Sequence, residues 1–420
     1  MRTVKKFCFL VLSFLFFFIC LITNAIPKLA VWFSCYDISR TLVASTEREF
    51  RVKATKVLDT IKNLGIKVIG FHVVSHADAN YPSEIYPLSK FICGVRGGTL
   101  PFDPFAIILE LTCERGIDVY AWFNPFRIGR SLDDLIPNHP AKILYERTPG
   151  AFLVATSGVW FNPGCPEAVE LIKQPIIEVA KKYGDRIRGI IFDDYFYPLG
   201  YVVEAQEAQN NISAFISSVG KEIKNIAPNC QFVISPTGNF VENARMGVDI
   251  QAWLKYVDVI VPQLYYGRKN AACPFEKTED KWGLCITGKD ENGMPVAEQI
   301  RWRFLTEKGL PLREFTELKK TGYGAALAVY KVGREDKYAG VAGQNEWIED
   351  GLRLLLWQIE FLSRDSRCEM IWLFNFDSVL KLFQTRPVDE ICDFMKVLQR
   401  FGGNIETLQR ILGVNIELGA

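Results

Sequence analysis

The sequence carries almost no net charge and few histidines. Its 49 Lys and Arg residues nearly balance its 48 Asp and Glu residues, and only three histidines are present. No basic excess exists that could attract a phosphate backbone, so nucleic acid is not an expected partner. With 49% hydrophobic and 23% charged residues, the chain is also too apolar to remain disordered. A length of 420 residues then allows one large domain or two to three ordinary ones.

Several familiar motifs are missing as well. The sequence has no CxxC pair, no zinc-type spacing, no GxSxG elbow and no P-loop, which leaves serine-hydrolase and nucleotide-driven chemistry without support. His72, His76 and Asp78 could be drawn as a metal cluster, but their spacing matches no known zinc pattern. We therefore predict no metal and no cofactor. Among the scattered cysteines, Cys273 and Cys285 bracket a loop and are the best candidates for a disulfide.

The longest apolar run lies at the N-terminus. Three basic residues precede Phe7–Ile22, and small or polar residues follow at Thr23-Asn24-Ala25. This pattern predicts a secretory signal peptide over residues 1–25, and therefore a secreted or periplasmic protein. The run of 16 residues is short of the roughly 20 that span a bilayer. An uncleaved membrane anchor is the alternative, and it is the only membrane contact that we expect.

The remaining chain alternates short apolar strands with amphipathic helices. Each expected strand is a continuous β-branched or aromatic run, which is typical of strands buried on both faces of a parallel sheet. The expected strands are Lys28–Ser34, Lys67–Val74, Ile117–Phe123, Ile187–Asp193, Gln231–Ser235, Val257–Leu264, Tyr323–Tyr330 and Met370–Phe376.

Eight strands alternating with helices predict an α/β fold of the (β/α)8 TIM-barrel type over residues 26–400, with a short helical tail over residues 401–420. A doubly wound open sheet is the alternative. It needs a Gly-rich phosphate loop after the first strand, and Cys35–Ser39 is not such a loop.

In a barrel of this type, the chemistry takes place where the strands end. Amide, carboxylate and aromatic side chains gather at these positions, and such a lining holds sugars by stacking and hydrogen bonding. The expected substrate-binding residues of this kind are Asp78, Trp122, Tyr195, Tyr197, Gln263, Tyr265 and Asn375.

The sharpest feature is the Asp193-Asp194 pair, which directly follows the apolar run Gly189–Phe192. Two carboxylates are costly to place at the end of a buried strand. Because side chains alternate along a strand, Asp193 shares a face with Gly189, whereas Asp194 points the other way. A small residue suits a crowded barrel interior, so we expect Asp193 to face inward. The plain structural alternative is that both aspartates cap loops or helices.

Six segments occur together in a recognisable order. They are Asp78–Ser83, Trp122–Arg127, Phe161–Glu167, Gly189–Pro198, Ile234–Pro236 and Pro262–Tyr265. Together they resemble the glycosyl-hydrolase-like family ten, secreted bacterial proteins that include enzymes digesting peptidoglycan glycan strands. The resemblance runs from about Glu47 to about Phe376.

The resemblance implies a TIM-barrel glycosidase with its site at the strand ends. By position, Asn124 and Arg127 would bind substrate, Asp193 or Asp194 would be the catalytic carboxylate, and Tyr265 would line the sugar subsite. Two departures from the family pattern bear on substrate specificity and on activity. The run Arg188–Ile191 replaces the usual Asp-Gly-Ile-His, and His72–Ser75 stands where Gln-Val-Arg is usual.

Glycoside hydrolysis usually needs two carboxyl groups, and the end of the fifth strand offers none. The possible second acids are Asp37, Asp78, Glu242 and Asp377. The other route is substrate assistance, in which a 2-acetamido group attacks the anomeric carbon. We therefore expect a secreted hydrolase of a cell-wall or related amino-sugar glycan. A non-catalytic glycan-binding barrel and a metal-dependent polysaccharide deacetylase are the alternatives.

Overall fold

The structure is a computed structural model, and it describes residues 26–193, 196–198, 201–238, 246–253, 255–267, 323–341, 343–365 and 367–413. Several sequence-based expectations fall outside these residues, and they stay predictions. They are the signal segment 1–25, Asp194, Tyr195, Glu242 and the Cys273–Cys285 pair.

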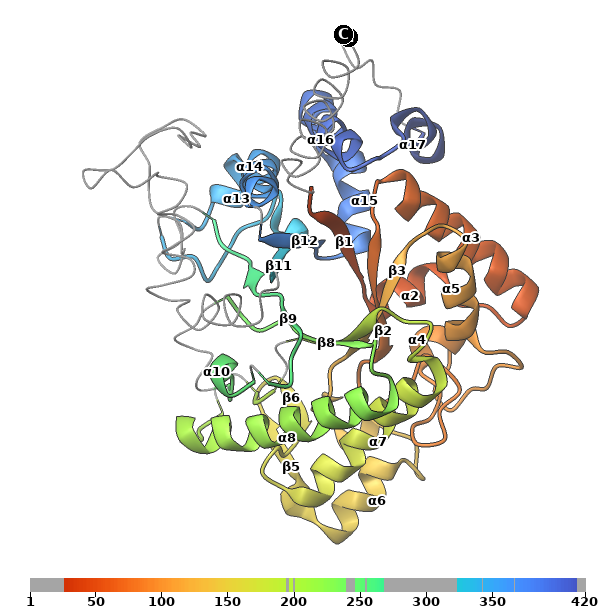
Figure 1. Cartoon of the computed structure of the whole chain (residues 1–420), viewed down its shortest axis with the longest axis vertical. Coiled ribbons are helices and arrows are strands. Elements are labelled where there is room, and N and C mark those ends of the chain that lie inside the picture. Colours follow the sequence, from red (N-terminus) through yellow and green to blue (C-terminus); the bar gives the residue numbers. More distant parts are fainter. Residues whose placement is uncertain are drawn as a thin grey trace, which may run out of the picture.

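The core of the fold is a curled sheet in which every strand pairing is parallel (Figure 1). The strands follow one another in the order β10-β11-β12-β1-β2-β3-β7-β8-β9. Their bounds are β1 Lys28–Phe33, β2 Val68–Val74, β3 Asp118–Phe123, β7 Gly189–Phe192, β8 Gln231–Ile234, β9 Val259–Ile260, β10 Gln263–Leu264, β11 Tyr323–Leu327 and β12 Cys368–Leu373. The predicted α/β class with a parallel sheet is therefore confirmed.

Helices cover the outer face of this sheet (Figure 1). They are α2 Cys35–Thr41, α3 Glu47–Asn63, α4 Lys90–Cys93, α5 Pro104–Cys113, α6 Pro140–Arg147, α7 Pro166–Tyr183, α8 Ala205–Ile226, α10 Ile250–Trp253, α13 Glu346–Glu349, α14 Gly351–Arg364, α15 Phe376–Thr385, α16 Val388–Arg400 and α17 Ile405–Leu412. Short 3-10 turns lie at η1 Leu132–Asp134, η2 Pro149–Ala151 and η3 Val329–Lys331. Within the described ranges, no helix is both long and apolar enough to cross a bilayer.

Large and small side chains alternate across the inner face of the sheet. The indole rings of Trp32 and Trp122 lie 4.6 Å apart, and those of Trp32 and Trp372 lie 4.9 Å apart. Glycine makes the room for them, because a Cβ at Gly70 would lie 2.9 Å from the Trp372 ring, and one at Gly189 would lie 2.8 Å from the Tyr120 ring. The inner face is therefore filled by packed side chains and leaves no room for substrate below the strand ends.

The sixth expected strand, Val257–Leu264, is observed as two short strands, β9 and β10. Pro262 stands between them, and proline has no N–H to donate to a neighbouring strand. The segment still bonds on both sides, because Val261 N donates to Ile234 O at 2.8 Å and Ala326 N donates to Pro262 O at 2.9 Å.

A second, antiparallel sheet was not predicted. It consists of β4 Arg127–Gly129, β5 Phe152–Ala155 and β6 Gly158–Phe161, in the order β4-β6-β5. These strands are only three or four residues long, so they carry too little alternation to be seen in the sequence. The sheet extends from the end of β3 and places Arg127 at its start.

The eighth expected strand, Met370–Phe376, ends earlier than predicted, because Phe376 begins α15. Asn375 caps this helix, and its Oδ1 accepts from Ser378 N at 3.3 Å and Ser378 Oγ at 2.7 Å. Within the described part of the expected tail, Ile405–Leu412 form α17, which packs against α3.

A buried carboxylate ties the first strand to the last one. Asp37 Oδ2 accepts from Ser34 N at 2.8 Å, Ser34 Oγ at 2.6 Å and Asn375 Nδ2 at 2.9 Å, and its Oδ1 accepts from Asp377 N at 2.8 Å. Burial raises the pKa of this carboxyl, and the hydrogen bonds from Ser34 oppose that shift. Asp37 therefore joins the end of β1 to the start of α15.

We predict that Asp37→Ala destabilises the fold strongly. The change leaves buried donors from three residues without an acceptor, and we expect the free energy of unfolding to fall by about 3 kcal/mol. Urea unfolding followed by circular dichroism measures this loss. Asp393→Ala on α16 is the control, because Asp393 is 65% exposed and should change stability little. Equal stability of the two variants would contradict the role given to Asp37.

Candidate active site at the carboxyl ends of the strands

Asp193 lies directly after β7 and faces the inner side of the sheet. Its side chain is buried, with 4% of its surface exposed, and its Oδ2 accepts a hydrogen bond from Trp122 Nε1 at 3.2 Å. Trp122 and Ile191 belong to the layer of side chains that fills the inside of the sheet. Asp193 therefore has the inward orientation that strand alternation predicted, and it lies on top of the packed interior.

His72 supports the Trp122 ring that contacts Asp193. The imidazole stacks on the indole with ring centroids 3.7 Å apart and an angle of 10° between the planes. Its Nδ1 accepts from Cys35 N at 3.3 Å, so the ring proton of the neutral form is on Nε2. Burial lowers the pKa of His72 well below its ordinary value, and the positive charge of Arg127 acts in the same direction. His72 is therefore a neutral donor at neutral pH.

Three buried polar atoms at the strand ends have no hydrogen-bond partner in the part of the chain that the structure describes. They are Nε2 of His72, Oδ1 of Asn124 and Oγ of Ser235. His72 lies in β2, Asn124 follows β3 and Ser235 follows β8, so all three stand near the same edge as Asp193. A buried polar group without a partner costs roughly 1–3 kcal/mol, and a polar ligand would remove that cost. His72 and Asn124 are close enough to affect each other, because the Asn124 side chain opposes the lowering of the His72 pKa.

Aromatic rings form one wall at this edge. The Tyr265 ring lies 5.8 Å from that of Tyr330 and 5.9 Å from that of Phe374, measured between centroids. Phe374 in turn lies 6.2 Å from the Trp122 ring. The wall therefore connects Tyr265 to Trp122 above the packed interior. Rings in this position can stack against the faces of sugars.

Two other predicted binding residues lie at the same edge but are held by the fold. Gln263 Nε2 donates to Ser235 O at 3.1 Å, which joins the end of β8 to β10. Asn375 Nδ2 donates to Asp37 and to Ser34 Oγ, so its amide belongs to the capping network of α15. Their predicted contacts with substrate stay predictions.

Tyr197 turns away from this edge. Its ring is part of the outer apolar core, and its hydroxyl accepts from Asn211 Nδ2 of α8 at 2.9 Å. Burial raises the pKa of this phenol. The position favours a packing role between the loop after β7 and α8.

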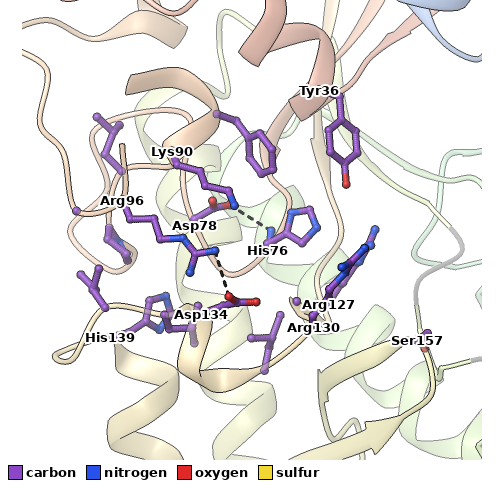
Figure 2. Close-up of a pocket in the computed structure, with 18 residues that line it drawn as sticks. Tyr36, His76, Asp78, Lys90, Arg96, Arg127, Arg130, Asp134, His139 and Ser157 are labelled. Carbon is purple, nitrogen blue, oxygen red and sulfur yellow. Dashed lines mark hydrogen bonds and ion pairs between the residues drawn. The ribbon is translucent and has the colours of Figure 1, made fainter. Parts of the chain in front are cut away.

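Asp78 and Arg127 line a side cavity next to Asn124 (Figure 2). Asp78 accepts from Ser75 Oγ at 3.1 Å, from His76 N at 3.2 Å and from Ser89 Oγ at 2.6 Å. These bonds hold the loop after β2. They also leave Asp78 a poor second catalytic acid, since its oxygens already bond within the loop.

The possible metal cluster does not form in the described ranges. His72 Nδ1 is occupied by a backbone N–H, and the Asp78 oxygens bond to Ser75, Ser89 and His76 N. Within the residues that the structure describes, no three His, Cys, Asp or Glu side chains come together in a way that could hold a metal ion.

Glu346 is a buried acid that sequence reasoning missed. It begins α13, in the loop region that follows β11, and only 3% of it is exposed. It lies against the chain just beyond β10, because a Cβ at Gly267 would meet Glu346 Oε2. In the sequence, Glu346 stands next to Trp347 after the seventh expected strand. Because it falls within the helical pattern of Asn345–Leu362, the sequence indicates a helical residue there and not a site residue.

A buried inward carboxylate, unpaired amide and imidazole groups and an aromatic wall lie together at the carboxyl edge of the curled parallel sheet. The profile of the family described as glycosyl hydrolase-like 10 matches residues 29–209 and 205–288, more than half of the chain. The protein belongs to this family, as its motifs indicated.

Two curated relatives carry the name glycosyl hydrolase. The chain is 28% identical to YngK of Bacillus subtilis (strain 168) over 277 residues, which cover 56% of this chain and 53% of YngK. It is 27% identical to DigH of Escherichia coli (strain K12) over 269 residues, which cover 54% of this chain and 60% of DigH. The chain thus spans between half and two thirds of the length of these relatives.

Among solved structures, the glycoside hydrolase domain of PgaB (BpsB) from Bordetella bronchiseptica matches at a TM-score of 0.48 and 11% sequence identity. The match covers 94% of this chain and 99% of that domain. Likeness at this level carries no argument about the reaction.

We predict that His72 makes the fold sensitive to acid. The unfolded imidazole titrates near pH 6.5 and the buried one well below it, so the unfolded state binds more protons and stability falls as pH falls. His72→Gln should remove about 1.4 kcal/mol per pH unit from this slope between pH 5.5 and 4.5. Urea unfolding at several pH values measures the slope. An unchanged slope in His72→Gln, with Lys396→Gln as control, would contradict a neutral buried His72.

Proposed function

We propose that this protein is a glycoside hydrolase that cleaves an amino-sugar glycan of the cell-wall type, with Asp193 as its general acid. The observation that carries the proposal is the buried Asp193 carboxyl, which faces inward from the end of β7 and accepts from Trp122 Nε1. A carboxyl in this position can protonate a glycosidic oxygen, which is the step that every such hydrolase needs. Membership of the glycosyl hydrolase-like 10 family supports the same reaction class.

We further propose that the sheet closes into a (β/α)8 barrel, with β9 and β10 as the two halves of one sixth strand. The two halves support this proposal because β9 pairs with β8 and β10 pairs with β11. An isolated parallel bridge between Thr237 and Gln263 joins the same two sides. Closure would make the edge that carries Asp193, the end of β8 and Tyr265 one continuous rim.

We propose substrate assistance as the mechanism. Two of the acids considered as the second catalytic group already bond to other residues. Asp37 accepts from Asp377 N at the start of α15, and Asp377 pairs with Arg40 and Lys381. An acetamido group offers one acceptor and one donor, which match the unpaired donor His72 Nε2 and acceptor Asn124 Oδ1. The acetamido oxygen would bond to the anomeric carbon while Asp193 protonates the leaving oxygen. Water would then attack that carbon, the bond from the carbon to the acetamido oxygen would break, and a proton of the water would return to Asp193.

A non-catalytic glycan-binding protein is the second candidate. The engagement of Asp37 and Asp377 in other contacts favours it. A binding protein needs the polar and aromatic lining but no second carboxyl. The family departure at Ile191 also favours it, since an isoleucine in the packed layer below Asp193 replaces the usual histidine.

We predict that Asp193→Asn abolishes cleavage with little change in glycan binding. Asparagine keeps an acceptor for Trp122 Nε1 but supplies no acidic proton, so kcat should fall by about a thousandfold. New reducing ends from purified N-acetylated glycan strands measure the rate. Asp118→Asn is the matched control, because Asp118 begins β3 at the opposite edge of the sheet. Full activity of Asp193→Asn would overturn the assignment.

Further outcomes separate the mechanisms. Substrate assistance predicts that chemically de-N-acetylated strands are not cleaved and that Glu346→Gln keeps most of the activity. A two-carboxyl mechanism that uses Glu346 predicts the reverse on both counts. Binding without new reducing ends in the unaltered protein would favour the glycan-binding candidate, and chelator-sensitive release of acetate would favour a deacetylase.

We also propose that residues 1–25 direct export and are removed. The basic start, the apolar run and the Thr23-Asn24-Ala25 segment support this proposal. N-terminal sequencing of the protein recovered from secreting cells should then begin at Ile26. An intact N-terminus in the membrane fraction would indicate the uncleaved anchor instead.

A further inference from the structure

A cavity of about 480 Å³ lies beside the candidate active site (Figure 2). Its walls come from the loop after β2, from α4, from β4 and from η1, with Tyr36 of α2 above them. Neither the apolar core nor the capping networks account for this space. It is large enough for one sugar ring with its substituents.

The lining of this cavity is positively charged. Four cationic side chains, Lys90, Arg96, Arg127 and Arg130, face two carboxylates, Asp78 and Asp134. Asp134 pairs with Arg96 at 3.4 Å, and Asp78 accepts three hydrogen bonds from its own loop and Ser89. In the described part of the chain, Lys90 and Arg130 form no ion pair. A concave surface with a cationic excess attracts anions.

His76 lies among the charged groups of the cavity, and its pKa responds to them. Burial and the charges of Arg127, Lys90 and Arg96 lower its pKa to about 4, although Asp78 opposes them. The nearby hydroxyl of Ser75 lies 3.0 Å from His76 Nδ1. Burial is the main cause of this lowered pKa, and the three cations add to its effect.

Arg127, which lines the cavity, also acts on the candidate active site through its charge. Arg127 acts on both imidazoles, since its charge lowers the pKa of His72 and of His76. His72 stacks on Trp122, whose Nε1 donates to Asp193. Arg127 also follows Asn124 by only three positions, and Figure 2 shows it directed toward the same space as His76 and Tyr36.

Aromatic rings at the cavity favour an anion carried by a sugar over a free ion. The rings of Tyr36 and Phe91 lie 5.5 Å apart in an edge-to-face contact, and the Phe91 ring lies 5.6 Å from that of His76. Tyr36 is about half exposed, so one face of its ring is open to a ligand. This pair gives a sugar ring an apolar surface next to the cations.

We infer that this cavity is a subsite for a glycan residue that bears an anionic substituent, a carboxylate or a phosphate, held by Lys90 and Arg130. The inference rests on the proposed glycoside-hydrolase function and names a feature of its substrate. It gives the enzyme a preference for acidic over neutral glycans at a position next to the cleaved bond.

Binding to the full chain tests this subsite. The probes are an N-acetylated oligosaccharide with one uronic acid, its carboxyl-reduced neutral counterpart, and the same neutral sugar carrying a phosphate ester. Calorimetry should show that an anionic probe binds about tenfold more tightly than the neutral one. The double variant Lys90→Gln with Arg130→Gln should abolish that difference. Lys396→Gln on α16 removes the same kind of charge elsewhere and should preserve it.

The histidine signals provide a readout that does not depend on catalysis. The chain has three histidines, so the imidazole of His76 can be assigned by its loss in His76→Gln. A bound anion should raise the pKa of His76 from about 4, because it offsets the charges of Arg127, Lys90 and Arg96. The preferred anionic probe, uronate or phosphate, then identifies the substituent.

Equal affinity for the charged and neutral probes, with no change at His76, would overturn the subsite. That result would leave the proposed function intact if neutral strands are still cleaved. Two results together would support the subsite and remove the hydrolase function. The Asp193→Asn protein would discriminate between the probes, and the unaltered protein would cleave no glycan.

Discussion

The fold depends on the packing of three indole rings inside the curled sheet. Trp32 contacts both Trp122 and Trp372, and Gly70 leaves space for these rings. Because these rings fill the interior, polar chemistry is confined to the layer above them. The same packing orients the Trp122 ring. Its apolar part fills the interior, and its Nε1 donates to Asp193. Core and site are therefore joined in one side chain.

Much of the architecture could be predicted because strands buried on both faces read as unbroken apolar runs. The runs at Lys28, Val68 and Gln231 begin strands within one residue of the expected position. The failures have physical causes. Pro262 divides a strand that hydropathy alone shows as continuous. Phe376 is apolar and extends the hydrophobic run, but the Asn375 cap makes it the first residue of α15. The strands of β4-β6-β5 are too short to show a period of two.

The site was predictable only where local pattern decides orientation. Alternation from Gly189 through Ile191 was enough to turn Asp193 inward, and the structure confirms that orientation. The bonds from Asn375 Nδ2 to Ser34 and Asp37 could not be predicted, because these partners lie more than 300 positions away. Tyr197 looked like a site residue by position, yet the loop after β7 turns it toward α8. The cationic cavity combines residues from separate loops, so no single sequence segment predicts it.

The bond between Asp377 N and Asp37 spans 340 positions of the chain. Strand β1 is also flanked by β12, which is completed only at Leu373. During synthesis, the first strand therefore has one free edge until Leu373 has left the ribosome. Loop closure of this length is slow, and an unpaired strand edge is a template for wrong partners. Because β12 is synthesised long after β1, there is a long interval in which the free edge of β1 could pair with a wrong strand.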